Sequence, residues 1–290
     1  MTDVVEPPRP DLVPDVPVAL DKLVRRVLCN NPGMMSGPGT NTYLVGIDEV
    51  AVIDPGPEDE GHTGAIVGAA GADAIRWILC THTHPDHSPG VPALQERTGA
   101  EVLAFDDRDG LVCDRHLADG DTVEATEFTL RAVHTPGHAS NHLCYLLERE
   151  RMLFTGDHVM DGSTVVISPP DGDMAAYLES IRRLQAWRPA LRSIAPAHGH
   201  LIDDPAAKLD EYLTHRLARE AQVLAELEAS MPQGAGTELL VEKIYTDVHE
   251  LLHPVARRSV WAHLRKLGDD GLAATIDRDD PDATWFTPDR

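Results

Sequence analysis

The stretch Thr81-His82-Thr83-His84-Pro85-Asp86-His87 places three imidazoles and one carboxylate within six residues, directly after an apolar run typical of a buried strand. Imidazole and carboxylate groups bind zinc, and also manganese or iron. His82 and His84, which are two residues apart, can face one metal ion, while Asp86 and His87 can turn toward a second. A polar turn with incidental histidines is the alternative, but four potential ligands at this density disfavour it.

One loop cannot complete two coordination shells, so further ligands must come from elsewhere in the chain. Three candidates each follow a short apolar run and lie close to a glycine. In layered α/β folds, sites gather at one end of the strands, and glycine permits tight turns and close backbone approach. These candidates are His138 in TPGH, Asp157 in TGD and His198 in PAHG.

The order of the expected elements indicates the fold class. The first half of the chain alternates strand and helix patterns, which favours α/β layering. Short, closely spaced runs then predict antiparallel strands, and helical periodicity returns after them. The predicted strands are Glu49–Asp54, Ile75–Thr81, Glu101–Phe105, Val123–Ala125, Phe128–Val133, Leu143–Leu147, Met152–Phe154 and Leu191–Ala195, and the predicted helices are Gly61–Ala70, Val91–Thr98, Met174–Trp187 and Pro205–Ser230.

The C-terminal region has its own pattern. Met231–Gly236 is a plausible linker, and a turn containing Pro254 separates two helices that follow it. Helix, helix and hairpin in that order are typical of a small winged-helix domain. The predicted elements are helices over Glu238–Tyr245 and Ala256–Gly268 and strands over Ala273–Ile276 and Thr284–Phe286.

Length and composition bound the protein class. With 290 residues and 42% hydrophobic content, the chain can bury one sizeable core, or one large domain and a small one. No run approaches eighteen apolar residues, so no membrane span is expected. The N-terminal leader is rich in proline and does not read as a signal peptide. Cys29, Cys80, Cys113 and Cys144 lack CxxC spacing and are interpreted as small core residues, in keeping with a reducing cytoplasmic setting.

The formal charge of −23 at pH 7 repels polyanions at long range. Stable binding of duplex nucleic acid is therefore not expected, although bound divalent metals make an acidic site locally positive. On the last predicted helix, four cations form a basic stripe: Arg257, Arg258, Arg265 and Lys266. This stripe is interpreted as a docking surface that shapes the cleft beside the metals, with nucleic-acid binding as the alternative.

The HxHxDH motif, followed by a lone histidine, an aspartate and a last histidine, resembles the metallo-β-lactamase superfamily. The resemblance extends to the branch called beta-lactamase-like protein two and covers nearly the whole chain after the leader. The segments that carry it are Asn31–Gly33, Gly39–Gly46, Gly156–His158 through Gly162–Val165, and Ser259–Gly271. It implies an αββα sandwich of two mixed sheets with helices outside and metals at one edge, and a small C-terminal winged-helix-like domain. The expected divisions are a leader at 1–20, a main domain at 21–230 and a winged helix at 237–290.

The resemblance also implies the ligand roles. The first metal would be bound by His82, His84 and His138, and the second by Asp86, His87 and His198, with Asp157 bridging the two. The cofactors are expected to be two divalent ions, zinc first, with manganese or iron as alternatives. One departure concerns His200, which stands where the family usually has proline; it is either a substrate contact or a solvated loop residue.

The expected mechanism follows from the metal pair. Two cations about 3.5–4 Å apart share a water and lower its pKa enough to supply hydroxide near neutral pH. Asp86 is the expected catalytic base, since it can orient that water and take its proton. Asp54 either supports a ligand histidine, as in the superfamily, or is only a turn residue. His142 and His158 lie near predicted ligands, whereas four others are expected to be structural or solvated: His62, His116, His215 and His249.

Three functions remain open at this stage. The first is hydrolysis of phosphodiesters in single-stranded RNA, because animal members of the resembling branch are endoribonucleases. The alternative is hydrolysis of thioesters, lactones or other small acyl substrates by the same site. The third is a nucleic-acid-binding regulator that acts through the winged helix. A monomer and a homodimer are both compatible with the sequence.

Overall fold

The computed structural model describes residues 12–162, 164–246 and 248–288. The chain divides into two compact units, which are described separately. The first unit comprises Met1–His134, Leu143–Ser163 and Leu191–Asp203, and the second comprises Thr135–His142, Thr164–Ala190 and Asp204–Arg290. Residues 1–11 of the predicted leader and Ser163 lie outside the described residues. The predicted domain boundaries stay a prediction.

The first unit contains a seven-stranded sheet in which the strands lie in chain order. Neighbours from β1 to β4 are antiparallel, and neighbours from β4 to β7 are parallel, so the sheet is mixed. Its strands are β1 (Val18–Ala19), β2 (Val24–Leu28), β3 (Asn41–Val45), β4 (Val50–Ile53), β5 (Ile75–Leu79), β6 (Glu101–Ala104) and β7 (Arg115–His116). The short β1 places the end of the predicted leader against β2.

The second sheet of this unit has five strands in the order β12-β11-β10-β9-β8. Only β11 and β12 pair in parallel; the other neighbours are antiparallel. Its strands are β8 (Thr122–Glu124), β9 (Thr129–His134), β10 (Leu143–Leu147), β11 (Met152–Gly156) and β12 (Ser193–Pro196). Two mixed sheets confirm the predicted α/β sandwich.

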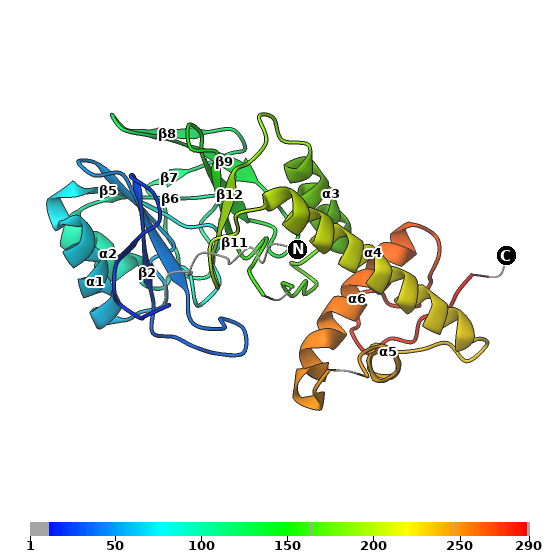
Figure 1. Ribbon diagram of the computed structural model, residues 1–290. Helices are drawn as coiled ribbons and strands as arrows, with labels where there is room; N and C mark the ends of the chain where they lie inside the picture. Colours follow the sequence, from blue (N-terminus) through cyan, green and yellow to red (C-terminus); the bar gives the residue numbers. More distant parts are fainter. Residues whose placement is uncertain (1–11, 163, 247, 289–290) are drawn as a thin grey trace, which may run out of the picture. The chain divides into compact units, whose positions relative to one another are not determined.

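Alternation along the strands builds a core on each face of the first sheet. In β4, Ala51 and Ile53 join the cluster between the two sheets, where Tyr145 and Phe154 of the second sheet also lie. The alternate residues of β4 face the other side, which α1 (Glu60–Ala70) and α2 (Val91–Thr98) cover (Figure 1). A 3₁₀ turn, η1 (Ala72–Ala74), links α1 to β5.

The second unit is helical. The long α4 runs past α5 and α6 and packs on both (Figure 1). Its helices are α3 (Met174–Gln185), α4 (Pro205–Ala229), α5 (Thr237–Ile244), the 3₁₀ turn η2 (Glu250–Leu252) and α6 (His253–Asp269). Buried side chains of α4, α5 and α6 form one cluster with Trp285, which is 2% exposed. The cluster is the core of the predicted winged helix.

Two details of this region correct the sequence-based prediction. Pro254 does not lie in a turn before the last helix but in the first turn of α6, where its missing N–H costs no hydrogen bond. The predicted hairpin is reduced to single bridges, one of which joins Ala274 to Phe286. Within the predicted linker, Ala235 is buried and bridges to Trp285.

Two compositional predictions can also be compared with the structure. All four cysteines are free thiols, and three of them are buried: Cys29, Cys80 and Cys144. This matches their interpretation as small core residues. Among the described residues, no helix is both long enough and apolar enough to cross a membrane.

Candidate metal centre

Six of the seven predicted ligands lie in the first unit, at the ends of three strands. The loop His82–His87 follows β5, Asp157 follows β11 directly, and His198 follows β12. Because β11 and β12 are parallel neighbours, Asp157 and His198 leave the second sheet at the same edge. The first sheet meets this edge where the Leu143 N–H donates to the Thr81 carbonyl at 2.7 Å. The ligand loops of both sheets are thereby brought together.

Four donor groups surround one point of this edge. Nε2 of His87 lies 3.6 Å from Oδ1 of both Asp86 and Asp157. Nε2 of His198 lies 3.4 Å from an Asp86 oxygen and 3.2 Å from Asp157 Oδ1. Ligands about 2.0–2.1 Å from a tetrahedral metal are themselves roughly 3.3 Å apart, so these spacings fit a metal ion.

Hydrogen bonding on the far side of each ring fixes how these histidines face the site. His87 Nδ1 donates to Asp54 at 2.9 Å, and His198 Nδ1 donates to the Gly39 carbonyl at 3.0 Å. The opposite nitrogen, Nε2, is buried in both rings and makes no hydrogen bond of normal geometry with any described residue. Each ring therefore turns Nε2 toward the site, the nitrogen through which it would bind a metal there.

The charges of this group are strongly coupled. Burial raises the pKa of Asp157, but His87 and His198 outweigh it and hold that pKa well below its usual range. Burial lowers the pKa of His198, but Asp157 and Asp86 outweigh it and raise the pKa to about 9. Asp86 has a lowered pKa because the attraction of His87 and His198 exceeds the effect of burial. The carboxylates are therefore anionic at neutral pH, as metal ligands must be.

The remaining two histidines of the motif extend the cluster. His82 Nε2 and His84 Nδ1 are 3.0 Å apart, and His82 Nδ1 lies 3.0 Å from the Thr81 hydroxyl. Ligand atoms of His82, His87 and Asp157 all lie within 4.8 Å of one another. This places Asp157 within reach of both halves of the motif, as its predicted bridging role requires.

His138, the seventh predicted ligand, belongs to the second unit. Its Nδ1 lies 2.7 Å from the Val166 carbonyl, which orients the ring in the same way as the ligand histidines above. Gly137 before it has φ +143°, and a Cβ there would come within 2.4 Å of the Tyr177 Cα. The loop thus requires glycine to pack against α3. Assignment of His138 to the first metal stays a prediction.

Asp54 is more than a turn residue. It is 2% exposed and accepts hydrogen bonds from the Thr81 N–H and hydroxyl, both at 2.7 Å, in addition to the one from His87. Its φ of +51° is a left-handed conformation that aspartate tolerates better than most side chains. The alternative in which Asp54 supports a ligand histidine is the one that the contacts favour.

Sequence reasoning missed the residues that anchor the His198 loop. The Asn41 amide donates to the carbonyls of Pro196 and Gly199, both at 2.9 Å, and the Tyr43 hydroxyl donates to Pro196 at 2.7 Å. Both anchors belong to the segment Gly39–Gly46, which the sequence analysis used only for the resemblance. The sequence of β3 does not single out Asn41, because the strand begins with two polar residues, Asn41 and Thr42.

The other histidines have local partners. His200 is held by Asp161, with 3.4 Å between His200 Nδ1 and Asp161 Oδ2, and a role in substrate contact is not tested by this geometry. His62 bridges the Thr42 hydroxyl and Asp15, in agreement with its interpretation as structural. His142 is buried beside the Thr135 hydroxyl, and His158 is buried next to Asp157.

The chain is similar to known proteins along most of its length. The family model described as "Metallo-beta-lactamase superfamily" matches residues 36–198, and that of the "Beta-lactamase associated winged helix domain" matches residues 237–285. The chain is 34% identical to the lactamase-like protein adaB of Aspergillus niger, over 86% of this chain and 83% of that protein. It is 35% identical to an atrochrysone carboxyl ACP thioesterase of Aspergillus chevalieri, over 82% and 76% of the two chains.

The crystal structure of a beta-lactamase domain protein from Burkholderia ambifaria is similar in fold. Its TM-score is 0.81 at 19% identity, and the match covers 96% of each chain. At this identity the likeness concerns the fold alone.

Proposed function

Because this chain belongs to the hydrolases of the metallo-β-lactamase superfamily, we propose that it hydrolyses an acyl thioester at a centre of two divalent metal ions. The observation that carries the proposal is the similarity to a thioesterase over most of both chains. The buried cluster of imidazoles and carboxylates supports the hydrolytic chemistry. Zinc fits this donor set, as do manganese and iron.

The proposed ligands are those of the sequence analysis. His82, His84 and His138 would hold one ion, Asp86, His87 and His198 the other, and Asp157 both. When bound, the ions supply a Lewis acid that polarises the thioester carbonyl and lowers the pKa of water.

The chain itself positions these groups and handles the proton. Asp54 and the Gly39 carbonyl fix the tautomers of His87 and His198, so that both rings face the site. Asp86 is the more exposed of the two ligand carboxylates, at 27% against 11% for Asp157. Its lowered pKa keeps it ionised at neutral pH, which is the form of a carboxylate that can accept a proton. A water oxygen bonds to the carbonyl carbon and the carbon–sulfur bond breaks. The proton that Asp86 accepts from the water passes to the leaving sulfur.

Cleavage of single-stranded RNA, the first expectation from the sequence, has less support. The relative from Aspergillus chevalieri is named for its reaction, and that reaction is thioester hydrolysis. The formal charge of −23 also disfavours a polyanionic substrate. The acyl alternative is therefore the better-supported function.

A substrate panel tests this proposal. Metal-reconstituted wild type would be offered a short acyl N-acetylcysteamine thioester, a lactone, bis-nitrophenyl phosphate and fluorescent single-stranded RNA. We expect thiol release from the thioester, reduced about 10²–10⁴-fold in Asp86→Asn and unchanged in Asp48→Asn, which removes a carboxylate outside the cluster. Cleavage of RNA with the thioester left intact would refute the proposal.

A further inference from the structure

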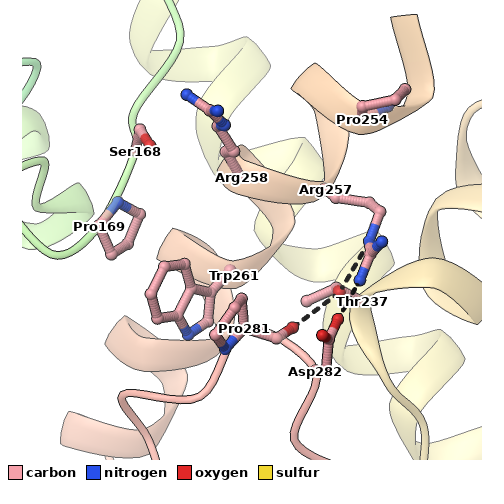
Figure 2. Close-up of a pocket in the computed structure, with 9 residues that line it drawn as sticks. All are labelled: Ser168, Pro169, Thr237, Pro254, Arg257, Arg258, Trp261, Pro281 and Asp282. Atoms are coloured by element: carbon pink, nitrogen blue, oxygen red, sulfur yellow. Dashed lines mark hydrogen bonds and ion pairs between the residues drawn. The ribbon is translucent and has the colours of Figure 1, made fainter. Parts of the chain in front are cut away.

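A cavity of about 520 Å³ lies within the second unit, beside α6 (Figure 2). Its volume falls within the ~300–1,000 Å³ range of small-molecule sites. Ser168 and Pro169 line one side, and Trp261 and Pro281 line another. None of these residues belongs to the proposed metal centre, so the cavity has no role in the function derived so far.

The basic stripe of α6 is largely neutralised within the chain. Arg257 pairs with Asp282, and Arg265 pairs with Asp279. Lys266 contacts Glu220 at 2.9 Å and Asp270 at 2.7 Å. Three of the four cations are thus committed to intramolecular pairs, which weakens the alternative that the stripe binds a nucleic-acid backbone.

Arg258 is the exception, and it lines the cavity. It is exposed and forms no ion pair or hydrogen bond with any residue in the described ranges. Figure 2 shows that Arg257 points toward Asp282 and Thr237, whereas Arg258 points to the side of Ser168 and Pro169. A single uncompensated guanidinium on a chain with a formal charge of −23 is a local site for one anionic group.

The cavity walls around Arg258 are suited to contact a flexible, mostly apolar part of a ligand. Trp261 is 7% exposed, and its indole N–H donates to the Arg278 carbonyl at 3.1 Å, so its ring is held in place. Three prolines, Pro169, Pro254 and Pro281, add rigid apolar surface. A cation beside such walls fits a ligand that joins one phosphate to a neutral, flexible arm.

We propose that this cavity binds the 4′-phosphate end of a pantetheine arm that carries the acyl thioester. The inference rests on the proposed function, because a thioester substrate on an acyl carrier is attached through that arm. Coenzyme A and a carrier protein share this group. Arg258 would bind the phosphate, and Trp261 and the prolines would contact the arm.

Binding measurements on the full-length protein test the assignment. Calorimetry would compare 4′-phosphopantetheine with pantetheine on wild type, Arg258→Met, Arg258→Lys and Arg76→Met. The last is a matched control, because Arg76 is an exposed arginine of β5 outside the cavity. We expect wild type and Arg76→Met to prefer the phosphorylated ligand about tenfold, the preference to disappear in Arg258→Met, and Arg258→Lys to retain part of it.

Hydrolysis separates this inference from the proposed function. Arg258→Met should lower kcat/KM about tenfold for acyl coenzyme A or for acyl carrier protein. The substrate whose kcat/KM falls identifies the source of the arm. Hydrolysis of a short thioester without phosphate should be unaffected. The inference would be overturned if wild type bound 4′-phosphopantetheine and pantetheine equally. It would also be overturned if Arg258→Met abolished binding of RNA and left the preference for the phosphorylated ligand unchanged. Thioester hydrolysis without a phosphate preference would refute only the inference. A phosphate preference without hydrolysis of any thioester would refute only the function.

Discussion

Replacing Asp54 by asparagine should weaken metal binding without changing the fold. The carboxylate accepts three hydrogen bonds, two from Thr81 and one from His87 Nδ1. Asparagine keeps the shape and tolerates the φ of +51°. Its amide oxygen can still accept from the Thr81 N–H, but its NH₂ group then faces His87 Nδ1. That contact favours the tautomer with the proton on Nε2, the nitrogen that faces the site.

The magnitude follows from these bonds. Loss of an outer partner of a ligand histidine typically lowers metal affinity about 10–100-fold. A buried donor left without its acceptor costs about 1–3 kcal/mol of unfolding free energy, measured on metal-free protein. Both effects would be absent from Asp59→Asn, because Asp59 caps α1 through the His62 N–H at 2.8 Å and asparagine caps equally well.

Competition with a chromophoric chelator measures the affinity, and urea unfolding measures the stability. We expect Asp54→Asn to hold one ion about 10–100-fold more weakly than wild type, with Asp59→Asn unchanged. Wild-type affinity in Asp54→Asn would show that the His87 tautomer does not depend on Asp54, and the reasoning would fail.

Three further predictions concern stability. Gly137→Ala should lose more than about 2 kcal/mol of unfolding free energy, because its Cβ would come within 2.4 Å of the α3 backbone; urea unfolding checks this. Asn41→Ala removes the amide donor to the Gly199 carbonyl beside His198, while the Pro196 carbonyl keeps its hydrogen bond from Tyr43, so we expect a loss of about 1–3 kcal/mol and weaker metal retention on dialysis. Burial lowers the pKa of His263, despite its partner Glu220, below the ordinary value of 6.5. The unfolded chain then binds the proton more readily, so stability is full above pH 6.5 and falls as the pH drops through the lowered pKa. Denaturant titrations from about pH 5 to 8 should show this slope in wild type and a flatter one in His263→Gln; equal slopes would contradict it.

The histidine loop could be predicted from sequence because its ligands are dense and follow a recognisable strand. The same reasoning did not predict β2, because its sequence VRRVL contains two arginines and does not look like a strand that pairs on both sides. Arg25 explains this, because it donates to the carbonyls of Ala69 at 2.9 Å and Gly46 at 2.5 Å instead of remaining in solvent. Arg26 is 2% exposed despite its charge. Charge patterning along one strand does not reveal partners that only the folded chain supplies.

The anchors of the site show the same limit. Asn41 and Pro196 are 155 residues apart in the chain, and no local pattern relates them. On α6 the sequence reveals four cations but not that three of them pair with carboxylates of the same chain. Arg258 stands out only after those pairs are known. The residue types of the site were therefore predictable, whereas the contacts that orient and neutralise them were not.

Metal content measured together with thioester hydrolysis tests the central claim most directly. Wild type, Asp157→Asn and Asp48→Asn would be reconstituted with zinc, desalted and assayed for bound metal and thiol release. Asp48→Asn makes the same change of charge at an exposed position outside the predicted ligand set. We expect about two ions per chain and thiol release in wild type and Asp48→Asn, with both lost in Asp157→Asn. Retention of both ions and full activity in Asp157→Asn, or no bound metal in wild type, would contradict the central claim.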